Sequence, residues 1–150
     1  MIYSSACEYA IRAATHLALR PSGAYVSAGQ ISDAENIPAP FLSAVLQRLV
    51  AADLLGSVRG PGGGYALARA PEEISLYDIR AAIDGVADLE GCALGLGTCS
   101  DEATCPLHET WKPIREQIHR YLTDTTLERT AEALAPLSSR DAIPGRRRTT

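Results

Sequence analysis

Apolar residues recur at helical spacing from the start of the chain and predict two helices before residue 40. Ser5 and Glu8 have the spacing of a capping box, and the apolar residues that follow them are three or four positions apart. A second capping box, Ser27 with Gln30, opens a short helix that we expect to end near Asn36.

A third helix is predicted after Pro38 and Pro40, which break the chain and preset the first turn. One of its faces is apolar and consists of Leu42, Val45, Leu46 and Leu49. The opposite face is small or polar and consists of Pro40, Ser43, Ala44, Gln47, Arg48 and Ala51. Two short helices joined by a tight turn are typical of a helix-turn-helix.

A glycine-rich segment, residues 60–64, follows this pair and separates two short stretches of strand character, residues 57–59 and 65–67. An isolated turn of this kind merely closes a hairpin. After a helix-turn-helix, however, it indicates a wing that lies along a minor groove while the third helix enters the major groove. The expected DNA contacts are Ser43, Ala44, Gln47, Arg48, Arg59, Gly60, Gly62 and Gly63.

The second half of the chain contains two further helical patterns with an aperiodic segment between them. Ser75 begins a helix that ends at Asp84, and residues 88–104 show no periodicity, which at this length favours a functional loop. From Pro106 to about Glu132 one apolar stripe predicts a single long helix. The stripe consists of Leu107, Trp111, Ile114, Ile118, Leu122 and Leu127.

Length and composition are those of one compact globular domain with a short appendage: 150 residues, 46% apolar and 21% charged. The net charge of −4 is unevenly distributed. Residues 1–69 contain five arginines against four acids, whereas residues 70–135 contain thirteen acids against five basic residues. The first half is therefore free to meet phosphates. No apolar stretch approaches a membrane span and no signal peptide is recognisable, so we expect a cytoplasmic protein.

Three of the four cysteines lie close together, and in a reducing compartment this pattern favours metal binding or redox chemistry. Six residues separate Cys92 from Cys99, five separate Cys99 from Cys105, and His108 follows three positions later. Structural zinc usually has a close cysteine pair, whereas an iron-sulfur cluster tolerates wider spacing. Unmetallated redox thiols are a third possibility. Cys7 lies within the first helix and is expected to be a core residue.

Residues 1 to about 134 resemble the IscR/NsrR-type (Rrf) winged-helix iron-sulfur regulators. The resemblance rests on residues 8–13, on Phe41-Leu42, on the wing sequence of residues 57–65, and on residues 105–108. It implies that the long helix pairs with that of a second subunit and that Arg59 enters the minor groove. The chain departs from the iron-sulfur biogenesis regulator in having Ser43-Ala44 where that protein has a Glu-Gln pair.

The resemblance also implies an iron-sulfur cluster bound by Cys92, Cys99 and Cys105. His108 matches the histidine ligand of the iron-sulfur biogenesis regulator and is our choice of fourth ligand. Glu8 is the alternative, because it matches a carboxylate that other members contribute from the partner subunit. A non-cysteine ligand favours a 2Fe-2S centre over a 4Fe-4S centre.

The expected fold is mainly α with a small β wing, a winged helix-turn-helix followed by a long C-terminal dimerisation helix. We expect a DNA-binding domain over residues 1–86, a cysteine-bearing loop over 87–105, the dimerisation helix over 106–134 and a mobile basic tail over 135–150.

The expected function is that of a homodimeric transcription regulator that binds double-stranded operator DNA and senses redox state, nitric oxide or iron status. The alternative is a zinc-stabilised or thiol/disulfide-based regulator without a cluster. No enzyme, small-molecule substrate or membrane partner is expected, because no nucleophile-base pair is recognisable and the glycine-rich segment leads into a strand.

Overall fold

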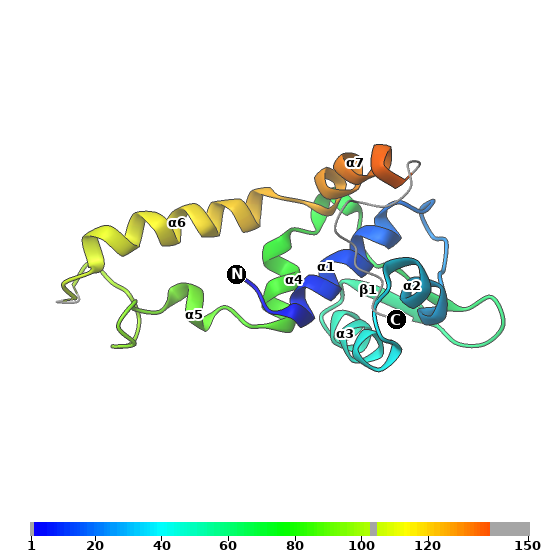
Figure 1. Ribbon diagram of the computed structural model, residues 1–150, viewed down its shortest axis with the longest axis horizontal. Helices are drawn as coiled ribbons and strands as arrows, with labels where there is room; N and C mark the ends of the chain where they lie inside the picture. Colours follow the sequence, from blue (N-terminus) through cyan, green and yellow to red (C-terminus); the bar gives the residue numbers. More distant parts are fainter. Residues whose placement is uncertain (1, 103–104, 139–150) are drawn as a thin grey trace.

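The computed structural model describes residues 2–102 and 105–138 and is mainly helical with one small sheet, which confirms the predicted fold class (Figure 1). In chain order the elements are α1 Ser5–Ala18, α2 Ala28–Glu35, α3 Ala39–Ala51, β1 Leu55–Val58, β2 Gly64–Leu67, the 3-10 helix η1 Pro71–Glu73, α4 Leu76–Ile83, α5 Ala87–Glu90, α6 His108–Asp124 and α7 Leu127–Ser138.

Helix α1 is the centre of the core and contacts α2, α3, α4, β2 and α7. Its inner face is small, with Ala10 and Ala13 fully buried, so the neighbouring helices approach closely. The apolar face predicted for α3 is buried as expected, and its members are Leu42, Val45, Leu46 and Leu49. The α2 capping box between Ser27 and Gln30 is also confirmed.

The start of α1 differs from the prediction. The N-cap is Ser4 and not Ser5: the Ser4 hydroxyl accepts a hydrogen bond from the amide of Cys7 at 3.1 Å, and its carbonyl accepts one from the amide of Glu8 at 2.9 Å. The side chain of Asp84 selects this register, because it accepts a hydrogen bond from the Ser4 amide at 2.8 Å. The capping box therefore does not explain Glu8.

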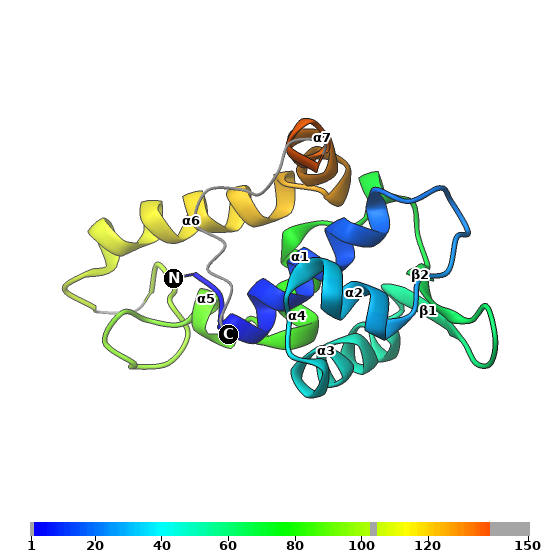
Figure 2. The ribbon, with the colours of Figure 1, turned by 45° about the vertical axis from the view of Figure 1, so that its right-hand side comes forward.

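Where the sequence predicted one helix over residues 106–134, the structure has two. Thr125 is extended (φ −92°, ψ 106°), and its carbonyl accepts a hydrogen bond from the amide of Leu76 at 2.9 Å. The amide of Leu127 donates to the carbonyl of Ile74, also at 2.9 Å. This strand-like pairing ends α6, and Leu127 then lies fully buried in the core, so that α7 packs against α1 (Figure 2).

The wing is an antiparallel hairpin in which Leu55 pairs with Leu67 and Val58 with Gly64. A third segment joins it, because Val26 and Tyr65 exchange backbone hydrogen bonds of 2.9 and 2.8 Å. The wing is thus attached to the chain just before α2.

Helix α6 extends away from the body formed by α1–α4, and the cysteine-bearing segment lies towards its outer end, opposite the wing (Figures 1 and 2). The predicted tail begins later than residue 135, because α7 continues to Ser138; residues 139–150 lie outside the described residues. Within residues 2–102 and 105–138 no helix has the length and apolar character needed to cross a membrane.

Candidate functional site

The outer face of α3 is exposed, as a groove-binding helix requires. Ser43, Ala44 and Gln47 all lie on the surface, held there by the buried leucines of the opposite face. Phe41, in the first turn, is 62% exposed. Phe41 was not predicted from the sequence, although a large aromatic side chain on the polar face of this helix is a signal that marks a candidate DNA contact.

Arg48 is exposed but already has a partner. Its guanidinium donates a hydrogen bond to the carbonyl of Ile83, the last residue of α4. A basic side chain near the end of a helix satisfies one of the carbonyls that the helix leaves free. Arg48 therefore connects α3 to α4, a role that the spacing of the sequence did not indicate.

The glycines of the wing are required by the hairpin itself. Gly60 and Gly62 have φ values of +93° and +74°, and the amide of Gly63 donates to the carbonyl of Gly60 at 2.9 Å. A Cβ on Gly63 would lie 2.9 Å from that same carbonyl oxygen. Arg59 follows β1 directly and its side chain is exposed. The turn thus places Arg59 beside glycines, whose backbone is not covered by side chains.

The cysteine-bearing segment is folded by its own backbone. Gly91 and Thr98 form a β-bridge. The amide of Cys92 donates to the carbonyl of Gly97 at 2.8 Å, and the amide of Cys99 donates to the carbonyl of Glu90 at 3.0 Å. These bonds form a closed loop that carries one cysteine at each end.

The thiols of Cys92 and Cys105 form the first of two pairs, with their Sγ atoms 3.3 Å apart. The backbone amides of Leu94 and Leu96, together with Cys105, lower the pKa of Cys92. The backbone amide of Leu107 acts to lower the pKa of Cys105, but the Cys92 side chain, desolvation and the charge of Cys99 together outweigh it, and the pKa of Cys105 is raised.

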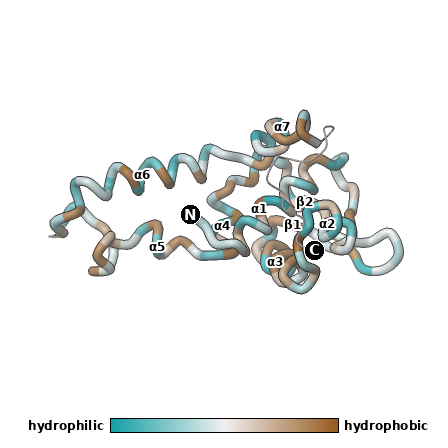
Figure 3. Tube along the Cα trace, in the orientation of Figure 1, coloured by the Kyte–Doolittle hydropathy of each residue, from teal (hydrophilic) through white to brown (hydrophobic). Residues whose placement is uncertain are grey.

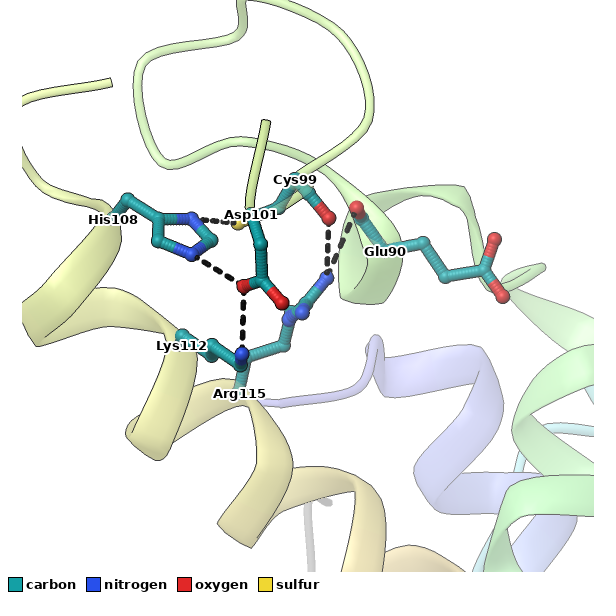
Figure 4. Close-up of polar contacts among 6 residues, drawn as sticks. All are labelled: Glu90, Cys99, Asp101, His108, Lys112 and Arg115. Atoms are coloured by element: carbon teal, nitrogen blue, oxygen red, sulfur yellow. Dashed lines mark hydrogen bonds and ion pairs between the residues drawn. The ribbon is translucent and has the colours of Figure 1, made fainter. Parts of the chain in front are cut away.

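Cys99 and His108 form the second pair, at the first turn of α6 (Figure 4). The Cys99 Sγ lies 3.3 Å from His108 Nδ1, and both residues are buried, 8% and 7% exposed. On the other side of the ring, Asp101 Oδ1 lies 3.0 Å from His108 Nε2 and 2.6 Å from Lys112 Nζ. The ammonium of Lys112 and then His108 lower the pKa of the Asp101 carboxyl. Asp101 and Lys112 were not predicted from the sequence.

The side chains of α6 also hold the backbone of this segment. Arg115 donates to the carbonyls of Glu90 and Cys99, each at 3.4 Å (Figure 4). The indole of Trp111 donates to the carbonyl of Gly91 at 3.2 Å. The loop is therefore attached to the first two turns of α6.

The four predicted ligands lie in one region but as two pairs. Among the described residues no group of three or more ligand-type side chains has a spacing suited to a single metal ion. The two pairs are neighbours: the amide of His108 donates to the carbonyl of Cys105 at 3.1 Å, and the bridge between Gly91 and Thr98 brings the backbones of Cys92 and Cys99 together. Three thiols and one imidazole are the donors that iron-sulfur clusters use, so the residues fit such a group chemically.

Glu8 and Cys7 lie elsewhere. Glu8 forms an ion pair with Arg12 (Oε1–Nη1 3.7 Å), and its side chain is 48% exposed. Cys7 is fully buried in the core, where desolvation raises its pKa to about 12. This confirms the expectation that Cys7 is a core residue.

A buried arginine that the sequence analysis did not single out joins the two halves of the chain. Arg80 is 3% exposed and donates to the carbonyls of Ile2 at 2.7 Å and Gly85 at 2.6 Å, and to the Asp88 carboxylate at 2.6 Å. Its signal in the sequence is weak, since a lone arginine on a helix usually lies in water.

Comparison with known proteins gives consistent results. A family described as Rrf2, "Iron-dependent Transcriptional regulator", matches residues 3–133. An HTH-type transcriptional regulator of Aquifex aeolicus is 33% identical over 130 residues, which cover 85% of this chain and 90% of that protein.

Two solved structures are similar to the chain, each at 25% identity and each over 87% of its length. CymR, the global cysteine regulator of B. subtilis, has a TM-score of 0.75 and is covered to 95%, and IscR of T. potens has a TM-score of 0.69 and is covered to 85%. The names of these relatives describe regulators and not enzymes.

Proposed function

We propose that this chain, which belongs to the Rrf2 family of transcriptional regulators, is a homodimer whose affinity for operator DNA is set by an iron-sulfur cluster. The observation that carries the proposal is the gathering of Cys92, Cys99, Cys105 and His108 into two neighbouring ligand pairs, each with 3.3 Å between its members. We place its action in the cytoplasm and its signal in redox state, nitric oxide or iron status.

The pairing of the ligands favours two irons over one metal ion. Structural zinc needs four ligands around one centre, and the described residues do not offer that arrangement. In a 2Fe-2S centre each iron takes two protein ligands, which agrees with Cys92 and Cys105 as one pair and Cys99 and His108 as the other. Such a cluster supplies one-electron redox chemistry and reactivity towards oxidants.

His108 remains our choice of fourth ligand. It is buried, its Nδ1 faces a cysteine sulfur, and its other nitrogen faces a carboxylate, an arrangement that metal-binding histidines commonly show. Glu8 stays the named alternative from a partner subunit. Within the chain its carboxylate faces Arg12.

The experiment that tests the cluster is purification of the full chain without oxygen, followed by iron, sulfide and zinc analysis and a visible spectrum. We expect a brown protein that loses its absorption in Cys92→Ala, Cys99→Ala and Cys105→Ala, while Cys7→Ala, the matched control, keeps it. The fold should survive, because the main core cluster takes no residue from the loop. His108→Ala should alter the spectrum and Glu8→Ala should not.

Each of three results would overturn all or part of this assignment. A colourless wild-type protein that contains zinc favours the zinc-stabilised alternative. A colourless, metal-free protein favours the thiol-based alternative, which the 3.3 Å approach of Cys92 and Cys105 also supports. If Cys99→Ala keeps its full iron and sulfide, the assignment of ligands is wrong.

For DNA we propose that Ser43, Ala44 and Gln47 read the major groove and that Arg59, with the backbone of Gly60, Gly62 and Gly63, contacts the minor groove and the phosphates. Arg48 acts mainly by holding α3 on α4. In operator titrations at fixed salt, Arg59→Ala should weaken binding by about 1–3 kcal/mol. The control is Arg69→Ala, which removes another exposed arginine just beyond β2. Equal effects of the two changes would contradict the assignment.

We further propose that α6 pairs with α6 of a second copy. Hydrophobic positions recur along α6 (Figure 3). Leu107, the N-cap of α6, and Ile114 and Tyr121 within it are 42%, 51% and 47% exposed. Leu122 and Leu127, which the sequence assigned to the same stripe, are fully buried within the chain. Sedimentation should show a dimer, and Ile114→Glu should give monomers; a monomeric wild type would refute the pairing.

Contacts within the chain connect the cysteine-bearing segment to α3, the helix that we propose reads the major groove. α5 leads to Cys92 and is held on α4 by the ion pair between Asp88 of α5 and Arg80 of α4. Arg48 of α3 contacts the end of α4, at the carbonyl of Ile83. A rearrangement of the cysteine segment can therefore act on α3 through the end of α4.

A further inference from the structure

His108 has a different partner on each ring nitrogen, and the two partners have opposite requirements. Nε2 lies 3.0 Å from Asp101 Oδ1, and Nδ1 lies 3.3 Å from Cys99 Sγ. A neutral imidazole carries its proton on one nitrogen and a lone pair on the other. A carboxylate can only accept a hydrogen bond, so the nitrogen that faces Asp101 must carry the proton. The lone pair is then left on Nδ1, beside the sulfur.

The carboxylate, whose side chain is 74% exposed, has a second donor. The ammonium of Lys112 lies 2.6 Å from the same Oδ1 atom of Asp101, and Lys112 lies one helical turn beyond His108 on α6. Two donors on the same oxygen favour the orientation in which it faces the ring. The His108 ring is 7% exposed, so water has little access with which to stabilise the other tautomer.

From this geometry we propose that Asp101 is a positioning residue: it fixes His108 as the Nε2–H tautomer, so that the Nδ1 lone pair faces the Cys99 sulfur. Lys112 serves this role by holding Asp101. Without a cluster, Nδ1 accepts a hydrogen bond from the Cys99 thiol. The use of the same lone pair to bind iron rests on the proposed function, but the tautomer itself does not.

The first experiment measures the tautomer in the cluster-free, reduced full chain. Two-bond ¹H–¹⁵N correlation spectra of protein labelled in its three histidines distinguish the two tautomers and the doubly protonated ring. His108→Ala assigns the signals. At pH 8 we expect Nε2–H in the wild type and a mixture in Asp101→Asn, because an amide can present either a donor or an acceptor to the ring.

Glu102→Gln is the matched control. It also removes one negative charge, from the exposed residue next to Asp101, and it should leave the tautomer unchanged. Asp101→Glu, which keeps the carboxylate, should retain more of the Nε2–H form than Asp101→Asn. Nδ1–H, a doubly protonated ring in the wild type, or an unchanged tautomer in Asp101→Asn would each overturn the proposal.

The second experiment uses the protein purified with its cluster. Loss of a residue that orients a metal-binding histidine commonly weakens metal binding by about tenfold to a hundredfold. Asp101→Asn should therefore lose iron to a chelator at least tenfold faster than Glu102→Gln, with a changed nitrogen coupling in the pulsed EPR spectrum of the reduced protein. Equal rates and couplings would contradict the proposal. A colourless wild type with the Nε2–H tautomer would contradict the cluster alone.

Discussion

Substitution of Gly64 by alanine should detach the wing from the segment that precedes α2. Gly64 has φ +142°, and a Cβ there would lie 2.7 Å from the amide nitrogen of Ser27 and overlap the carbonyl of Val26. Gly62→Ala is the matched control, because Gly62 also has a positive φ (+74°) but has open space around its Cβ position. Both variants change one wing glycine and add one methyl group.

The expected magnitude follows from the contacts that each variant loses. Gly64→Ala breaks the hydrogen bonds of 2.9 and 2.8 Å between Val26 and Tyr65, each worth about 1 kcal/mol. The disfavoured φ adds about 1–3 kcal/mol. Gly62→Ala costs only about 1–2 kcal/mol of left-handed strain. Alanine restricts the unfolded chain equally in both variants, so this effect cancels in the comparison. The variants should therefore differ by about 2 kcal/mol in the free energy of unfolding.

Urea unfolding of the cluster-free chain, followed by circular dichroism, measures this difference. With a slope of about 1–3 kcal/mol per molar urea, the Gly64→Ala midpoint should lie about 1 M below that of Gly62→Ala. Operator binding should follow the same order, because the displaced wing no longer presents Arg59. Coincident midpoints would refute the argument that the contact between the wing and Val26 requires glycine.

Three further results are expected. Burial raises the pKa of Cys7 to about 12, so Cys7 should resist alkylation in a folded chain that lacks the other three cysteines. The stability of the fold should decrease as the pH rises from about 9 towards 12, because only the unfolded state readily forms the thiolate. Rapid labelling of the folded chain would contradict this. Hydrogen bonding to Arg80 lowers the pKa of Asp88, so the stability from this pair is present above the ordinary carboxyl pKa of 3.8 and is lost in stronger acid. Asp88→Asn should therefore lower the urea midpoint at pH 7, and the gap should narrow as the pH falls below 3.8. Phe41→Ala should weaken operator binding several-fold and leave the urea midpoint unchanged, because the ring is 62% exposed.

Elements whose stabilising contacts lie within a few residues were predictable from the sequence. The α2 capping box joins Ser27 and Gln30, three residues apart, and the wing follows from the glycine run between two short strand patterns. The apolar face of α3 likewise repeats within one helix. The spacing of the cysteines and His108 indicated a ligand site for the same reason: its members are close in the chain.

The exact ends of α1 and α6 and the partner of Arg48 were decided only by the tertiary structure, because they depend on contacts between residues far apart in the chain. Asp84 selects Ser4 as the N-cap of α1 from 80 positions away, and pairing of Thr125 with Leu76 ends α6 where the apolar period alone would continue it. Arg48 finds its partner in Ile83 by the same kind of contact. In each case a polar group pairs with another that lies far away in the chain, and helical periodicity carries no information about which distant group will satisfy it.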